Sequence, residues 1–279
     1  MTIHPAWVGL SLVGHLGAKT FRALLARFGT PEHVLTADES SLRAITGIGP
    51  KISQQIRAVD VQQVEANLRR WQARGVCVLT WQDDAYPEPL RPLDDAPPTL
   101  FVRGEQPINR PIAIVGTRHP TESNRRYAQN LASTLVEKGW CIVSGLALGV
   151  DAAAHMGALA LPAGRTLAVL GGGVLNIFPP EHTRLADVVL RQGALLSETN
   201  PEAPASAGQL VARNRLISGL SEALIVIQTE ADGGAMYAAR FARAQGRPVY
   251  ALDIDAGGNR LLLETGAHPL RPDLSDLPF

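Results

Sequence analysis

One arginine in this sequence stands where phosphate-binding folds usually place further glycines. Residues 112–120 read IAIVGTRHP, a short apolar run followed by Gly116, Thr117 and Arg118. Nucleotide-binding strands usually continue with the spacing G-x-G-x-x-G, which is absent here. A guanidinium supplies fixed positive charge and can hold a phosphate with two parallel hydrogen bonds. We therefore expect these three residues to belong to an anion-binding site.

Small and hydroxyl residues follow other apolar runs of the chain. One run ends at Ser144 and Gly145, and later runs end at residues 171–173, 197–198 and 229–230. Ligands of α/β proteins bind beyond the carboxyl ends of parallel strands, where small residues allow close approach of the backbone. The set suits a phosphate-bearing ligand. Alternatively, its glycines only let strands turn into helices.

A second basic element is the tripeptide Arg213-Asn214-Arg215 within LVARNRLISGL, residues 210–220. If the segment is helical, its apolar stripe faces inward and the tripeptide lies on the other face or at its rim. Asn214 can both donate and accept at a phosphate or a base edge. The tripeptide either contributes to the anion site or is simply solvated.

The string TGIGPKISQQI, residues 46–56, matches the turn of a helix-hairpin-helix motif. In such a turn the backbone N–H groups of Gly47 and Gly49 face a DNA phosphate, and Lys51 adds charge. Such turns also occur in modules that bind only proteins. A secondary DNA contact at these residues is therefore one of two alternatives.

Asp151 and His155, four residues apart, could form an acid–base couple. No nucleophile stands beside them in a setting such as G-x-S-x-G, and a helix-start carboxylate with a histidine that satisfies it is the simpler interpretation. The histidines show no metal-binding spacing, so we expect no metal site. Cys77 and Cys141 lie in apolar stretches, which predicts buried reduced thiols.

The elements that must position these residues change character along the chain. From residue 112 onward, apolar runs without polar alternation are separated by helical stretches, which predicts a doubly wound, mostly parallel α/β sheet. The first part of the chain reads instead as short helices, one ending at Gly29 and a later one capped by Thr36. The expected domains are residues 1–75, helical; 76–256, the sheet domain, with a Pro-rich extension at 76–111; and 257–279, a C-terminal tail.

Bulk properties exclude several classes of protein. The formal net charge of zero argues against a strongly basic nucleic-acid coat protein. No apolar run approaches the roughly 18 residues of a membrane span. The N-terminus lacks the basic segment and cleavage site of a signal peptide. The expected reduced thiols fit the cytoplasm, which is the predicted location.

In order along the chain, the strings VGTR, VSGLALGVDAAAH and RNRLISGL resemble the DprA/Smf family of DNA-processing proteins. The resemblance extends over residues 1–256. It implies an extended Rossmann-like domain, preceded by a helix-hairpin-helix (SAM-like) domain, that binds and protects single-stranded DNA. It further implies loading of the RecA recombinase during natural transformation, a homodimer, no cofactor and no enzymatic reaction. Carried onto this chain, the strand-binding pocket comprises Gly116, Thr117, Arg118, Ser144, Gly145, Arg213, Asn214 and Arg215.

The chain departs from the family pattern in three respects. Leu210 and Val211 stand where members usually show an aromatic residue and a proline, and a missing stacking ring costs about 1–3 kcal/mol per base. Residues 232–239 lack the hydroxyl groups typical of members. We also expect no C-terminal winged-helix domain within these 279 residues. The alternative from another class is a nucleotide phosphoribohydrolase on a related fold, which would need a glutamate where this chain has Arg240.

Overall fold

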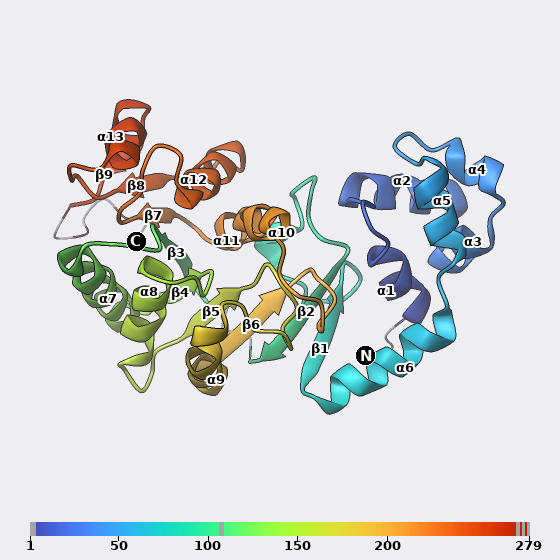
Figure 1. The fold of residues 1–279 in the computed structure, drawn as a ribbon, viewed down its shortest axis with the longest axis horizontal. Coiled ribbons are helices and arrows are strands. Elements are labelled where there is room, and N and C mark those ends of the chain that lie inside the picture. Colours follow the sequence, from blue (N-terminus) through green and yellow to red (C-terminus); the bar gives the residue numbers. More distant parts are fainter. Residues whose placement is uncertain (1–3, 106–108, 272–273, 275–276, 278–279) are drawn as a thin grey trace. The chain divides into compact units, whose positions relative to one another are not determined.

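The computed structural model describes residues 4–105, 109–271, 274 and 277. The chain divides into two compact units. The first consists of Met1–Phe101 with Glu198–Asn200, and the second of Val102–Ser197 with Pro201–Phe279. Figure 1 traces the elements of both units along the chain.

The first unit is built mainly from short helices around a small core. In chain order they are α1 (Pro5–Ser11), α2 (Ala18–Phe28), α3 (Pro31–Thr36), α4 (Glu39–Arg43), α5 (Pro50–Arg57) and α6 (Val61–Ala73). Apolar side chains from these helices form one cluster, including Trp7, Phe21 and Leu24. As predicted, α2 ends at Gly29, whose φ of 84° is a left-handed conformation that favours glycine.

The predicted cap at Thr36 is wrong. Thr36 is the last residue of α3, and Asp38 caps α4 by accepting a hydrogen bond from the backbone N–H of Ser41. The capping-box spacing from Thr36 to Glu39 was misleading because a carboxylate two residues later offers a stronger, charged acceptor to the same helix start.

Residues beyond the expected boundary at 75 also pack in the first unit. This stretch contains β1 (Val76–Thr80) and a 3-10 turn (Glu88–Leu90), and β2 (Thr99–Gly104) begins near its end. The indole N–H of Trp7 donates to the carbonyl of Pro98 at 2.9 Å, and Arg22 donates to the carbonyl of Leu93 at 3.1 Å. These hydrogen bonds group most of the Pro-rich extension with the helices.

The second unit is organised around a parallel sheet, which confirms the predicted α/β class. Its strands are β3 (Pro111–Val115), β4 (Cys141–Ser144), β5 (Thr166–Val169), β6 (Gly193–Ser197), β7 (Leu224–Val226), β8 (Val249–Ala251) and β9 (His268–Pro269). Their order in the sheet is β6-β5-β4-β3-β7-β8-β9, and each of these neighbouring pairs is parallel. The central strand is therefore β3, which runs into Gly116 and Arg118.

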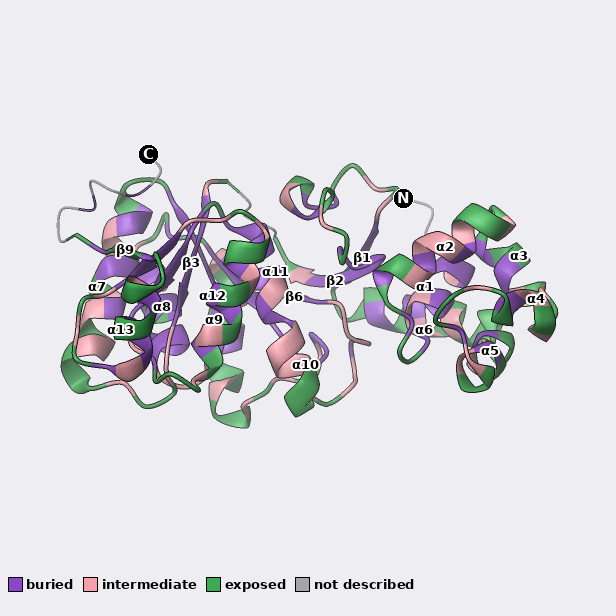
Figure 2. Cartoon of the chain, turned by 90° about the horizontal axis from the view of Figure 1, so that it is seen from above, coloured by how far each residue is buried: buried purple, intermediate pink, exposed green. Residues whose placement is uncertain are grey.

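Helices enclose the sheet of the second unit. They are α7 (Glu122–Glu137), α8 (Val150–Leu159), α9 (Thr183–Gln192), α10 (Ala207–Ala212), α11 (Asn214–Leu220), α12 (Gly234–Ala244) and α13 (Gly257–Glu264). Ile112 and Ile114 of β3 join a buried cluster with side chains of α7 and α8. The strands are buried, whereas many residues on the outer faces of these helices are exposed (Figure 2).

Two segments differ from their expected form. The stretch around Arg213 is two short helices, α10 and α11, that meet at Arg213. Residues 257–279, expected to be a tail, include α13 and β9, and β9 pairs with β8. Of these residues, 272–273, 275–276 and 278–279 lie outside the described part. None of the helices in the described part is long and apolar enough to cross a membrane.

Candidate nucleic-acid interface

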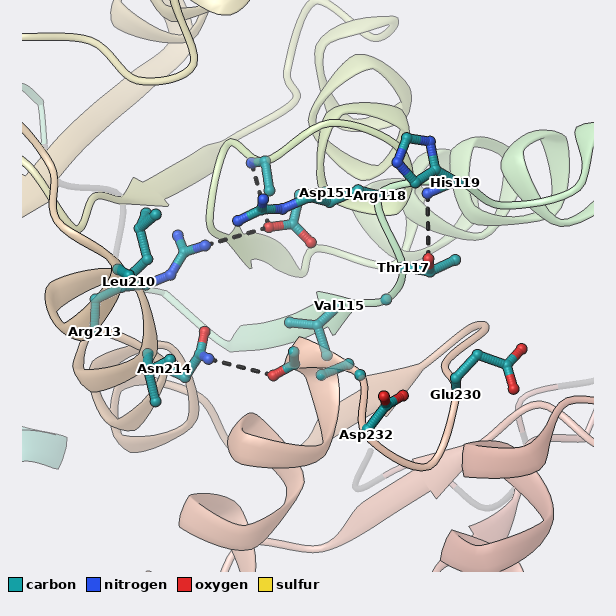
Figure 3. A pocket seen from close by; sticks show the side chains of 17 residues that line it. Val115, Thr117, Arg118, His119, Asp151, Leu210, Arg213, Asn214, Glu230 and Asp232 are labelled. Carbon is teal, nitrogen blue, oxygen red and sulfur yellow. Dashed lines mark hydrogen bonds and ion pairs between the residues drawn. The ribbon is translucent and has the colours of Figure 1, made fainter.

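A pocket of about 570 Å³ lies at the carboxyl ends of β3 and β7, within the second unit. Its size falls in the range typical of small-molecule pockets, roughly 300–1,000 Å³. Four segments form its wall, and Figure 3 shows their side chains. They are residues 115–119 after β3, Ala147 and Asp151 at the start of α8, residues of α10 and α11, and residues 230–235 before and within α12.

Gly116, Thr117 and Arg118, which the sequence analysis places in an anion site, line this pocket; their binding of an anion stays a prediction. A Cβ at Gly116 would lie 2.5 Å from Val150, so only glycine allows this close packing of the turn on α8. The N–H of Thr117 donates to the carbonyl of Gln228 at 2.7 Å, which ties the turn to the end of β7. The turn is thereby fixed, while the side chain of Arg118 is exposed.

Arg118 also lines a second, smaller pocket of about 230 Å³ beside the first. Within the described part of the chain, its guanidinium has no hydrogen bond or ion pair. It therefore keeps all five N–H donors for a ligand at the junction of the two pockets.

Of the expected pair Ser144 and Gly145, only Gly145 reaches a pocket wall. The Ser144 side chain is fully buried, its hydroxyl donates to the carbonyl of Ile114 at 2.7 Å, and it is absent from both pocket walls. Gly145 lines the second pocket. The Ser144 hydroxyl thus stabilises the junction of β3 and β4, and Gly145 is the member of the pair that meets the site.

The loop after β4 is held in place by the carboxylate of Asp151. That carboxylate accepts hydrogen bonds from the backbone N–H groups of Gly145 at 3.1 Å and Ala147 at 3.4 Å. Between them, Leu146 adopts a φ of 59°, and its carbonyl lies 2.8 Å from the Nδ1 atom of His182. A leucine rarely adopts this left-handed conformation, so the surrounding hydrogen bonds must hold it there.

Arg213 is buried, with 6% of its surface exposed, and the expectation that it lies on an outer face or rim is wrong. Its Nη1 atom donates to the carbonyl oxygens of Gly145 and Val169, both at 2.5 Å. Its Nη2 atom lies 3.8 Å from the Asp151 carboxylate. The physical reason for burial is that two carbonyl oxygens accept from Nη1 and that the Asp151 carboxylate compensates a charge that would otherwise be costly to bury.

Burial also governs the protonation of this pair. It raises the pKa of the Asp151 carboxyl, an effect that the nearby Arg213 guanidinium and the backbone N–H groups oppose. Burial lowers the pKa of Arg213, and Asp151 opposes that shift. Each group thus favours the charged form of the other.

The other two members of the tripeptide separate. Asn214 is buried in the wall of the larger pocket, where its Nδ2 atom donates to the carbonyl of Gly234 at 3.4 Å. Arg215 is half-buried and belongs to neither pocket wall, and its carbonyl accepts a hydrogen bond from the side chain of Gln245 at 2.9 Å. The structure therefore brings Arg213 and Asn214 to the site but not Arg215.

His155 and Asp151 do not bind each other, so the couple suggested by their spacing is not formed. Instead, Nδ1 of His155 lies 2.7 Å from the Thr166 hydroxyl. Burial is the main cause that lowers the pKa of His155 to about 3, so this histidine is neutral at physiological pH. Its role is structural.

An aromatic side chain that the sequence analysis missed lines the smaller pocket. Phe178 is 42% exposed and shares this pocket with Arg118 and Gly145. The signal was present in NIFPPEH, where two prolines after a phenylalanine indicate a loop rather than a core segment.

The helix-hairpin-helix turn lies in the first unit. Gly47 adopts a φ of 91°, Gly49 precedes the first turn of α5, and the Lys51 side chain is exposed. The geometry matches the predicted turn. Whether DNA contacts it remains a prediction.

Within the described residues, no group of three or more His, Cys, Asp or Glu side chains is arranged to hold a metal ion. Cys141 is buried, but Cys77 is exposed, so the prediction of a buried thiol is wrong for Cys77. The reason is strand alternation, because Cys77 is the outward-facing residue of β1 between buried Val76 and Val78.

The fold and pocket together define a Rossmann-like α/β protein with a pocket at the strand ends, joined to a small helical unit. Residues 77–275 match the sequence profile of the DNA recombination-mediator protein A family, and the chain belongs to this family. Residues 10–58 match the SAM-like helix-hairpin-helix tandem, which confirms the predicted N-terminal motif.

Related proteins agree with this assignment. The chain is 37% identical over 208 residues to the DNA processing protein DprA of Bacillus subtilis, covering 72% of this chain and 70% of that protein. It is 34% identical over 256 residues to the protein Smf of Synechocystis, covering 88% of this chain and 63% of that protein. The matches thus span about two thirds of the length of these relatives.

Two solved structures are similar to this chain. One is DprA from Streptococcus pneumoniae, with a TM-score of 0.84, 26% identity and full coverage of both chains. The other is DprA from Helicobacter pylori, with a TM-score of 0.64 and 30% identity, covering 70% of this chain and 90% of that one. The H. pylori structure was described for its single-stranded DNA binding mode.

Proposed function

We propose that this chain binds single-stranded DNA along the two adjoining pockets, with backbone phosphates held at Arg118. The observation that carries the proposal is the exposed guanidinium of Arg118, placed where the two pockets meet and without internal partners in the described residues. Single-stranded DNA binding by the H. pylori relative supports the same ligand. Gly116, Thr117 and Gly145 line the same two pockets and would form part of the surface that the strand contacts.

Phe178 offers the stacking surface that Leu210 and Val211 lack. Its ring is exposed in the pocket that it shares with Arg118, so a base next to the held phosphate can stack on it. Base–aromatic stacking contributes about 1–3 kcal/mol and tolerates any base. The pair Arg118 and Phe178 thus supplies charge and stacking, the two ingredients of binding that is tolerant of sequence.

In this proposal the tripeptide residues have unequal roles. Arg213 supports the loop at Gly145, Asn214 forms part of the pocket wall, and Arg215 contributes positive charge outside the pocket. Gly47, Gly49 and Lys51 form a secondary contact for the strand.

The wider role that we propose is that of a cytoplasmic recombination mediator. As a homodimer, the protein would protect incoming single strands and help to load RecA during natural transformation, without catalysing a reaction. The phosphoribohydrolase alternative is disfavoured because Arg240, where that class needs a glutamate, is exposed on α12 and is not in the pocket wall. Sedimentation of the protein and a RecA strand-loading assay test the dimer and the RecA step.

The direct test is fluorescence anisotropy of a labelled oligo-dT strand at several salt concentrations. Arg118→Ala is expected to weaken binding and to make the salt slope shallower by about 0.7 for each phosphate that the variant no longer neutralises. Phe178→Leu is expected to weaken binding by roughly 5- to 150-fold without changing the slope. Arg184→Ala is the control, because Arg184 is exposed on α9 outside both pockets. Equal binding by wild type and Arg118→Ala would refute the site.

A further inference from the structure

The larger pocket carries opposite charges on its two sides. Arg118 lies on one side, while Glu230 and Asp232 lie on the other, in the segment that leads into α12 (Figure 3). Both carboxylate side chains are exposed. A surface built only to attract phosphates would not place two carboxylates in the same pocket, because each repels the DNA backbone.

A buried donor in the same pocket wall also lacks a protein partner. Arg213 is more than nine-tenths buried, and within the described residues its Nε–H makes no hydrogen bond. Buried N–H groups without a partner are rare and call for a ligand or a water. That N–H is itself buried, so the groups that the wall presents to a ligand are the carboxylate acceptors of Glu230 and Asp232 and, opposite them, the guanidinium donors of Arg118.

This combination matches the edge of a nucleobase better than a phosphate. Carboxylates accept hydrogen bonds from exocyclic amino groups, such as N4 of cytosine, and a guanidinium N–H donates to ring nitrogens and carbonyl oxygens. Thymine has no amino group, and its carbonyl oxygens would face the carboxylates. Bases with an exocyclic amino group can therefore form hydrogen bonds with these carboxylates through that group, whereas thymine cannot.

We propose that Glu230 and Asp232 read the base edge, so that the pocket prefers nucleotides whose bases carry an exocyclic amino group over thymine. The proposal rests on the proposed binding of single strands at Arg118. The phosphate lies on the Arg118 side of the pocket and the base edge lies toward Glu230 and Asp232. Stacking at Phe178 remains tolerant of sequence, so the preference is a modest bias added to general binding.

The test compares oligo-dC with oligo-dT of equal length, above neutral pH, by anisotropy. Wild type is expected to bind oligo-dC about fivefold more tightly, the low end for one side-chain contact to a base. The double variant Glu230→Gln/Asp232→Asn is expected to bind both strands with a ratio near one and to bind oligo-dT more tightly than wild type does. The control pair Glu137→Gln/Asp187→Asn neutralises two exposed carboxylates of the same unit outside the pocket, and it should leave the ratio unchanged.

Each outcome separates this inference from the proposed function. A wild-type ratio near one, or a ratio that the double variant retains, overturns the base preference even if binding still depends on Arg118. Binding that is insensitive to Arg118→Ala overturns the proposed site, and with it this inference. Melting temperatures and the affinity for oligo-dT show whether the double variant is folded, and a single variant, Glu230→Gln, repeats the test if it is not.

Discussion

The buried pair of Asp151 and Arg213 leads to the most demanding prediction, the substitution Asp151→Asn. Asparagine keeps the shape of the side chain and one acceptor oxygen for the N–H groups of Gly145 and Ala147. It removes the negative charge that compensates the Arg213 guanidinium, and both side chains are at most 7% exposed. Breaking a buried pair by removing one partner typically costs about 3–5 kcal/mol.

The structure places the expected cost at the lower end of that range. The Nη2–Oδ2 distance of 3.8 Å is longer than a hydrogen bond, and Arg213 retains two carbonyl acceptors. We therefore expect a loss of about 3 kcal/mol in the free energy of unfolding of the second unit, since the charge is removed and the packing is kept. For a unit of this size, that loss corresponds to a melting temperature lower by about 6–12 °C.

Calorimetry and amide hydrogen exchange measure separately the loss of global stability and the loosening of the loop at Gly145 and Ala147. Calorimetry gives the global loss, while exchange in peptides that contain Gly145 and Ala147 reports on the loop. The control is Asp187→Asn, an exposed carboxylate on α9. If the free energy of unfolding fell by less than about 1 kcal/mol, as at exposed sites, and exchange in the loop stayed unchanged, the prediction would be refuted. The Asp151 carboxylate would then not support the site.

Three further predictions follow from the same unit. Gly145→Ala should destabilise the second unit and weaken oligo-dT binding, because the added Cβ would overlap the Arg213 guanidinium. In the control variant Gly208→Ala, the added Cβ meets nothing within 4 Å, so the change should be neutral or stabilising by up to about 1 kcal/mol. Because the pKa of His155 falls from 6.5 to about 3 in the fold, unfolded chains bind more protons below pH 6.5. Stability should therefore decline by up to about 1.4 kcal/mol per pH unit as the pH falls from 6.5 toward 3, and urea titrations of wild type and His155→Gln should differ in this slope. Burial raises the pKa of Cys141 from 9.0 to about 12, so stability should also decline as the pH rises above 9, and Cys141→Ala should show a smaller decline in the same titrations.

Apolar runs were the most reliable guide to this fold. Runs such as IAIVG and CIVSG form buried parallel strands. The first of these runs leads directly into Gly116, Thr117 and Arg118, which line the pocket at the carboxyl edge of the sheet. Parallel strands covered on both faces leave a strong local signal, because every position must be apolar. The edge location of Arg118 then follows from topology alone.

The burial of Arg213 could not be read from its own neighbourhood. Helical periodicity places an arginine on the outside unless a partner exists, and its partners are Asp151 on α8 and two carbonyls at the ends of β4 and β5. These groups are distant along the chain and meet it only in the folded sheet. Sequence periodicity predicts which apolar side chains are buried, but it does not predict that a charged side chain is buried together with its hydrogen-bond acceptors.

The two carbonyl hydrogen bonds of Arg213 have a consequence for the thermodynamics of binding. Gly145 and Val169 stand at the ends of neighbouring strands, so one guanidinium fixes their spacing before any ligand arrives. Little of the conformational entropy lost on binding then comes from the loop at Gly145, and most of it comes from the flexible strand and from exposed side chains such as Arg118. Stiffening the protein further would gain little affinity, whereas an oligonucleotide with conformationally locked sugars would lose less freedom and bind more tightly.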